Sequence, residues 1–279
     1  EGPNQALSGA IKPGESKTWK VKAVNAGVFM YHCDGDNLNG IWDHIASGMY
    51  GGIVVHSKYE RRPAKEFYVV FGEVYNTADK GLFTDIAHTN STTTTAIANS
   101  TSDKSVLQKK KVEQEIGSFD VNKFIANKPD LILTNGMAYK YMPFFGSENR
   151  IILNNNAELF KVKPGELTRW YVVNAGPRGY IAFNFASGMI NPITYSNDKS
   201  IAMGGNNNNA TTLPESKKVY EVSIPPGSAE AIDITFPQEG TYVGNDHDMG
   251  RFLIGAGFAV VATNNSTSND YPKGTWVPP

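Results

Sequence analysis

A single cysteine, followed at short intervals by a histidine and a methionine, constrains this sequence more than any other feature. Cys33 precedes His44 by eleven residues, and Met49 follows five residues later. Apolar strand-like runs flank this stretch, at 28–31 before the cysteine and at 51–55 after the methionine. Singly, such Cys and Met residues are most simply packing residues. Together in one loop, a thiolate, an imidazole and a thioether are typical of a blue-copper site, which uses two His, one Cys and a weak axial Met.

Composition predicts an all-β chain without a nucleic-acid or membrane partner. The sequence has 27 Gly and 15 Pro, is rich in Thr, Val and Asn, and shows few helical periodicities, which favours a β-sandwich. Its length of 279 residues suits two domains of ordinary size. A formal charge of −1 argues against nucleic acid or an anionic membrane as partner. No apolar run reaches the roughly 18–20 residues that a membrane span requires.

Two short patterns occur twice and indicate an internal repeat on the scale of a domain. Lys-Pro-Gly-Glu at 12–15 recurs at 163–166, and Val-Asn-Ala-Gly at 24–27 recurs at 173–176. Between the first pair of patterns, residues 17–24 alternate between apolar and polar side chains, which predicts a half-buried strand.

The strand patterns predict an incomplete first domain and a complete second domain. We assign 1–60 to the last part of the first domain, because a sandwich of this kind needs about 100 residues and about seven strands. The missing strands would precede Glu1 or come from another chain. Residues 61–265 form the second domain, with a polar insertion at about 76–117, and 266–279 form a C-terminal tail.

Three stretches carry a resemblance to a known family. They are Gly-Val-Phe-Met-Tyr-His-Cys at 27–33, Trp-Asp-His-Ile-Ala-Ser-Gly-Met-Tyr-Gly-Gly-Ile-Val-Val at 42–55, and Gly-Thr-Tyr-Val-Gly-Asn-Asp-His at 240–247. They resemble the copper-containing nitrite reductases, members of the multicopper oxidase superfamily with two cupredoxin domains per chain. The resemblance implies an all-β fold of two cupredoxin-type Greek-key β-sandwich domains, the first incomplete in this chain.

The resemblance also implies two kinds of copper site. Cys33, His44 and Met49 match the type 1 copper ligands, where electrons enter. His32 matches a type 2 copper ligand of one subunit, and His247 matches the ligand that the neighbouring subunit of a homotrimer contributes. Because adjacent residues of a strand point to opposite faces, His32 and Cys33 would bind different coppers, and the peptide between them would carry the electron.

The activity implied is the reduction of nitrite to nitric oxide and water, which takes one electron and two protons at the type 2 copper. His32 and His247 would then be the catalytic residues. The expected electron donor is a small protein such as a cupredoxin or a cytochrome. Glycosylation sequons such as Asn90-Ser91-Thr92 favour an extracytoplasmic location, whether secreted, periplasmic or pseudoperiplasmic.

Three features depart from the family pattern. The interval from Cys33 to His44 is two residues longer than in bacterial members, which indicates a longer loop. The remaining histidine ligands and the active-site Asp are expected before Glu1. The histidine that family members use for proton delivery in the second domain is absent from 182–189, where the resemblance would place it.

Two other functions stay open at this point. One is a different two-domain copper oxidoreductase that acts on oxygen, hydroxylamine or a phenol; a three-copper cluster would need His-X-His pairs, and the sequence has none. The other is a type 1 copper electron carrier without catalysis, for which a ligand at His247 would have no use. We interpret His56 and His88 as ordinary surface residues.

Overall fold

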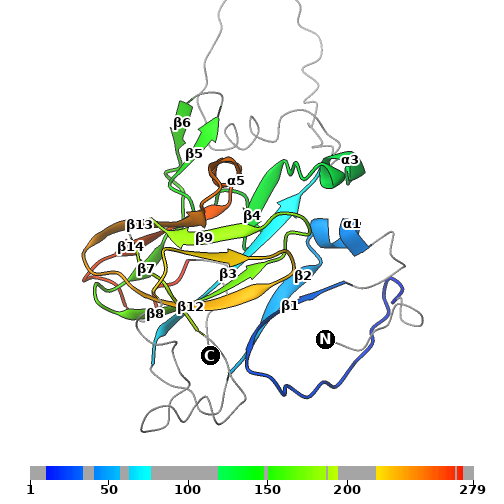
Figure 1. Ribbon diagram of the computed structural model, residues 1–279, viewed down its shortest axis with the longest axis horizontal. Helices are drawn as coiled ribbons and strands as arrows, with labels where there is room; N and C mark the ends of the chain where they lie inside the picture. The colour runs from blue at the N-terminus through cyan, green and yellow to red at the C-terminus, as the bar shows by residue number, and fades with distance from the viewer. Residues whose placement is uncertain are drawn as a thin grey trace, which may run out of the picture.

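The computed structural model describes residues 11–33, 41–56, 63–76, 119–147, 150–186, 188–193, 218–267 and 269–272. Strands dominate these ranges, and their helices are short, namely α1 (Ile41–Ala46), α3 (Val121–Ile125) and α5 (Met249–Leu253). Figure 1 shows a β-sandwich with a two-stranded hairpin, formed by residues 27–32 and 50–55, packed beside it. The all-β prediction is confirmed. In these same ranges no helix is long and apolar enough to cross a membrane.

Two five-stranded sheets form the sandwich. The first has the order β10-β12-β8-β3-β4 and consists of β3 (Lys65–Val74), β4 (Leu131–Thr134), β8 (Leu167–Asn174), β10 (Asn191–Pro192) and β12 (Ala229–Thr235). The second has the order β11-β9-β13-β14-β7 and consists of β7 (Phe160–Val162), β9 (Ile181–Phe185), β11 (Glu221–Ile224), β13 (Gly240–Asp246) and β14 (Gly257–Ala262). A separate hairpin joins β5 (Phe144–Ser147) to β6 (Arg150–Leu153).

The core lies between the two sheets and is largely aromatic. Trp170 of β8 is fully buried and stacks on Phe67 of β3, with ring centroids 4.3 Å apart, and on Phe258 of β14, with centroids 5.1 Å apart. Phe160 and Phe185 meet the same indole edge to face. Because buried aromatic rings remove large apolar areas from water, this cluster holds the two sheets together.

The small hairpin consists of β1 (Gly27–His32) and β2 (Tyr50–Val55), paired antiparallel from Gly27 with Val55 to His32 with Tyr50. Its side chains Val28 and Val54 pack against Tyr171 on the outer face of the first sheet. Strand β8 is therefore covered on both faces, by the core on one side and by the hairpin on the other, and is buried along nearly its whole length.

Two tyrosines seated over glycines bring the hairpin close to the first sheet. A Cβ at Gly72 of β3 would overlap the hydroxyl of Tyr50 from β2, and a Cβ at Gly52 of β2 would lie 2.9 Å from the ring of Tyr68 from β3. Burial raises the pKa of Tyr50 to about 12. The absence of side chains at these two glycines thus sets where β2, and the loop that precedes it, sits on the sandwich.

The two Lys-Pro-Gly-Glu copies form the same turn. The Glu15 amide donates to the Lys12 carbonyl at 2.9 Å, and the Glu166 amide donates to the Lys163 carbonyl at 3.1 Å. In each copy the Lys amide donates back to the glutamate side chain, at 3.3 Å and 2.9 Å respectively. The sequence repeat is therefore also a repeat of local structure.

The segments that follow these turns differ, and one prediction is wrong. Residues 167–174 form β8, whereas 17–24, predicted as a half-buried strand, are exposed and belong to no strand. The physical reason is pairing: β8 lies between β3 and β12, while 17–24 have no ladder partner in the described part of the chain. Alternation alone does not satisfy the backbone groups of a strand.

Part of the predicted organisation lies outside the described residues. This applies to nearly all of the polar insertion at 76–117, to His88 and to the end of the C-terminal tail. At the flanks of the insertion, Asn76 forms an antiparallel bridge with Phe119. Asp120 then caps α3 by accepting from the amides of Asn122 and Lys123.

Candidate metal centre

Backbone hydrogen bonds close the loop that carries the three predicted type 1 ligands. The Cys33 amide donates to the Met49 carbonyl at 3.0 Å, one step beyond the β1–β2 ladder. The Met49 amide in turn donates to the His44 carbonyl at 3.0 Å. The sequence predicted only a loop here, but the structure places His44 in the short helix α1. A helix of six residues is too short to show a helical period in the sequence.

Cys33 and His44 are brought into direct contact. The Cys33 sulfur lies 3.3 Å from the His44 Nδ1 atom, and both residues are half-buried. A thiolate and an imidazole nitrogen that face each other are soft and borderline donors of the kind that copper prefers, so these two residues fit the predicted metal. Met49 joins them through its backbone, while the residue as a whole is 54% exposed.

His32 is exposed at the end of β1 and is already oriented by a local contact. Its Nδ1 atom lies 2.8 Å from the carbonyl oxygen of Cys33. Because a carbonyl only accepts, Nδ1 carries the proton in this contact and Nε2 keeps its lone pair for a metal. The neighbouring Cys33 is half-buried, so the two side chains have different surroundings, as expected for adjacent strand positions.

His247 lies directly after β13, at the corner between β13 and α5. Its amide donates to the Ala182 carbonyl of β9 at 2.8 Å, which continues the β13–β9 ladder by one residue. Its Nδ1 atom lies 2.8 Å from the carboxylate of Glu221, the first residue of β11. Reasoning from the sequence missed Glu221, because a lone glutamate before an apolar run carries no signal for a contact with a distant histidine.

A buried charge network holds the backbone at this corner. Asp246 has a side chain that is 0% exposed, and it accepts from the amides of Ala182 and Asp248 and from the Arg251 guanidinium at 2.9 Å. Arg251 also pairs with the buried carboxylate of Glu73 at 2.8 Å. The network was likewise missed from the sequence, where Glu73 is far from the other members.

The pKa values of this network reflect its burial. Burial raises the pKa of the Asp246 carboxyl, although the amides of Asp248 and Ala182 and the Arg251 guanidinium act in the opposite direction. Burial acts to lower the pKa of Arg251, but the carboxylates of Glu73 and Asp246 outweigh it and raise that pKa. Arg251 therefore stays charged between two buried acids.

The predicted ligands are distributed over separate elements of the molecule. Cys33 and His44 belong to the hairpin and its loop, whereas His247 directly follows β13 of the second sheet. Among the described residues, no three His, Cys, Asp or Glu side chains gather into a group that could hold a metal ion. His56 is exposed, as expected from the sequence.

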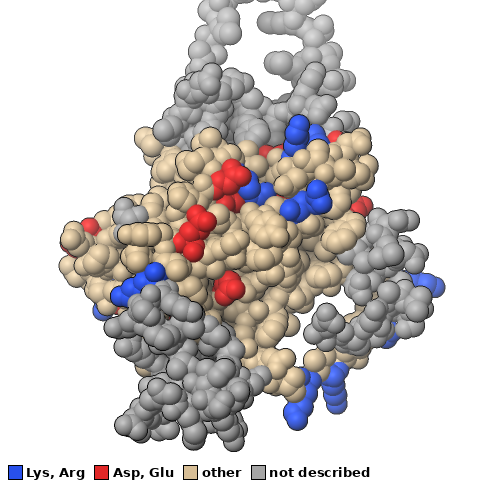
Figure 2. All heavy atoms as spheres, viewed as in Figure 1, with Lys and Arg blue, Asp and Glu red and all other residues tan. Residues whose placement is uncertain are grey.

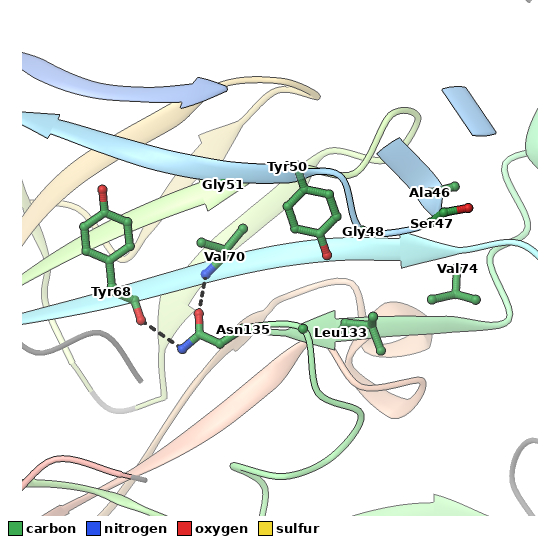
Figure 3. Close-up of a pocket in the computed structure, with 11 residues that line it drawn as sticks. Ala46, Ser47, Gly48, Tyr50, Gly51, Tyr68, Val70, Val74, Leu133 and Asn135 are labelled. Carbon is green, nitrogen blue, oxygen red and sulfur yellow. Dashed lines mark hydrogen bonds between the residues drawn. The ribbon is translucent and has the colours of Figure 1, made fainter. Parts of the chain in front are cut away.

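A hollow of about 610 Å³ lies where the hairpin and α1 meet β3 and β4. Figure 3 shows Tyr50 and Tyr68 at this hollow, with Val74 and Leu133 further along β3 and β4. None of the predicted copper ligands lines it. On the face drawn in Figure 2, Lys and Arg side chains lie near Asp and Glu side chains, so no single charge sign dominates that face.

The chain is similar in sequence to copper-containing enzymes. No protein-family model matches the chain. The copper-containing nitrite reductase of Neisseria gonorrhoeae is 27% identical over 241 residues, which are 86% of this chain and 46% of the relative. The copper-containing nitrite reductase of Neisseria meningitidis serogroup A matches with the same identity and coverage. The chain spans about half the length of these curated relatives.

Solved structures of copper proteins superimpose on this chain. The copper nitrite reductase of Nitrosomonas europaea superimposes with a TM-score of 0.64 at 25% identity, over 94% of this chain and 70% of that one. The copper-containing nitrite reductase of Thermus scotoductus gives a TM-score of 0.58 at 20% identity, over 91% of this chain and 45% of that one. A blue copper oxidase from Nitrosomonas europaea, at 16% identity, shares the fold. The predicted cupredoxin-type fold is confirmed.

Proposed function

We propose, from the premise that this chain is a relative of the copper-containing nitrite reductases, that it takes part in the one-electron reduction of nitrite to nitric oxide. The observation that carries the proposal is the contact of Cys33 with His44 at 3.3 Å in a loop closed by the Cys33–Met49 backbone bond. The sequence similarity to a copper-containing nitrite reductase over 86% of the chain supports the proposal.

Cys33, His44 and Met49 are the proposed ligands of the type 1 copper. The half-buried setting of Cys33 and His44 limits water at the thiolate, and the backbone bonds hold both donors in place without the metal. Met49 supplies a weak thioether ligand. Through its peptide bond to His32, Cys33 also provides the covalent path for the electron.

His32 and His247 are the proposed ligands of the type 2 copper, with His247 contributed by a neighbouring subunit of a homotrimer. Copper bound there would supply the one-electron transfer and the Lewis acidity that nitrite reduction needs. His32 presents Nε2 because its Nδ1 contacts the Cys33 carbonyl. The exposure of both histidines in separate elements supports a site shared between chains. A small cupredoxin or cytochrome is the proposed donor, and the proposed location is extracytoplasmic.

Metal content and electron paramagnetic resonance of the full-length protein test this proposal. We expect about two coppers per chain, one with the narrow hyperfine splitting of a thiolate site and one of type 2. The variant His247→Ala should lose the type 2 signal and nitrite-dependent nitric oxide formation while the blue copper stays. The control His56→Ala removes an exposed histidine outside both sites and should keep both signals.

The result also separates the proposed enzyme from its alternatives. A single blue copper that is unaffected by His247→Ala would contradict catalysis and leave an electron carrier. Two coppers without nitric oxide formation, but with turnover of oxygen, hydroxylamine or a phenol, would indicate another copper oxidoreductase.

A further inference from the structure

We infer that Glu221 is a positioning residue for His247: its carboxylate accepts the Nδ1 proton of the imidazole and so leaves Nε2 directed outward as the metal-binding atom. The inference rests on the proposed function, because it deepens the role given there to His247. Its direct support is the 2.8 Å contact between Glu221 and His247 Nδ1. Histidines that bind metals commonly donate their second ring N–H to a carboxylate or carbonyl, which fixes the tautomer and the ring orientation.

The strand register explains how two residues on non-adjacent strands meet. Glu221 of β11 pairs with Asn184 of β9, and Asn184 pairs with Asn245 of β13 on its other side. One step further along, His247 lies beside Ala182, so all of these side chains share one face of the second sheet. Strands two apart are separated by roughly 10 Å, a gap that a glutamate and a histidine side chain can bridge together.

Ala182 lies beside His247 on the strand between the two partners. Glu221 itself stands opposite Asn184, two residues along the same strand, so the contact runs diagonally across β9. The side chain of Ala182 is a single methyl group, and a larger side chain at this position would compete with the His247 ring for space on this face.

The backbone of His247 is fixed independently of Glu221. The buried Asp246 side chain binds the Ala182 and Asp248 amides on either side of the corner, and Arg251 anchors Asp246 in turn. What this frame does not set is the rotation of the imidazole, which can present either nitrogen. The contact with Glu221 makes that choice.

The contact is better suited to orienting the ring than to stabilising the fold. The His247 side chain is 58% exposed and that of Glu221 is 43% exposed. Even a fully charged pair with this exposure contributes little to folding stability, because water screens it and its side chains lose entropy. Loss of the Glu221 carboxylate should therefore leave folding intact and change the tautomer and orientation of the His247 ring.

Nitrogen NMR of histidine-labelled, metal-free, full-length protein tests the orientation. In the wild type we expect a single Nδ1–H tautomer for His247. Glu221→Ala should give a mixture of tautomers, Ala182→Leu should do the same without altering either partner, and Glu221→Gln should restore much of the selection because its amide oxygen still accepts. The control Glu239→Gln removes an equal charge just before the opposite end of β13 and should resemble the wild type.

Copper titration of the same full-length variants gives the second measurement. We expect Glu221→Ala to weaken binding at the type 2 site by about tenfold to hundredfold, the range measured for partners of metal-binding histidines, with the blue copper unchanged. An unchanged tautomer, or an affinity equal to that of Glu239→Gln, would overturn the inference. If nitric oxide formation is absent but both changes occur, the positioning role stands and the proposed function fails.

Discussion

The loop at 33–49 and the corner at His247 are both proposed to provide ligands for copper, but different interactions hold them in place. In the loop, backbone hydrogen bonds between Cys33, His44 and Met49 fix the donors, and the chain that joins them is short. At the corner, the Arg251 guanidinium pairs with two buried carboxylates, that of Asp246 close by in the chain and that of Glu73 far from both, and these contacts fix the backbone. A contiguous loop can therefore be recognised from residue spacing, whereas the corner depends on contacts that only the folded chain makes.

The largest expected effect is on the loop. Cys33→Ser removes the only thiolate, so we expect complete loss of the blue absorption and of the narrow-hyperfine signal, with a type 2 signal that persists. Visible absorption and electron paramagnetic resonance after copper loading check this. The control Ser47→Ala changes a neighbouring exposed side chain and should stay blue. If the Cys33→Ser protein is still blue, the loop is not the site of the blue copper.

The next largest effect is expected at the corner. Arg251→Ala leaves the buried carboxylates of Glu73 and Asp246 without their cation, which should reduce the free energy of unfolding by about 3–5 kcal/mol. Denaturant unfolding measures the change. The exposed Arg178→Ala should cost much less, within about 1 kcal/mol. If Arg251→Ala and Arg178→Ala lower the free energy of unfolding by the same small amount, buried charge does not distinguish the corner from the loop.

A smaller loss is expected where the hairpin meets the sandwich. Gly72→Ala places a methyl group against the Tyr50 hydroxyl and should cost about 1–3 kcal/mol through displacement of that ring. Because Tyr50 follows Met49, the blue copper spectrum should shift as well. Thermal unfolding and visible absorption check the two effects. Ile53 is half-exposed on β2, and Ile53→Ala serves as the matched control. Equal losses of stability in the two variants would argue against a special role for the packing of Tyr50 over Gly72.

The smallest effect is expected at the helix cap beside His247. Asp248 accepts from the amides of Gly250 and Arg251, and Asp248→Ala should cost about 1 kcal/mol. Asp120→Ala removes the equivalent cap of α3, far along the chain from either predicted site, and should cost a similar amount. Only the first variant should also change the NMR signals of His247. A response of His247 to both caps would show that the corner is not locally held.

The sequence predicted the two strands that flank the loop at 33–49, because apolar runs are local signals. Strands β1 and β2 lie where the runs at 28–31 and 51–55 indicated. The prediction for 17–24 was wrong, since alternation cannot supply a neighbouring strand, and the short helices α1 and α5 were missed because five or six residues show no helical period. Of the candidate site, Cys33 and His44 could be paired in advance through their spacing in one loop.

By itself, the sequence determined the all-β class and the repeated Lys-Pro-Gly-Glu turns, because each depends on neighbours in the chain. Only the tertiary structure decided that Glu221 contacts His247, that Arg251 joins Asp246 to Glu73, and that Tyr50 sits over Gly72. These contacts depend on strand register and on which strands are neighbours, and a one-residue shift in register would turn every side chain to the other face. No local pattern encodes that choice.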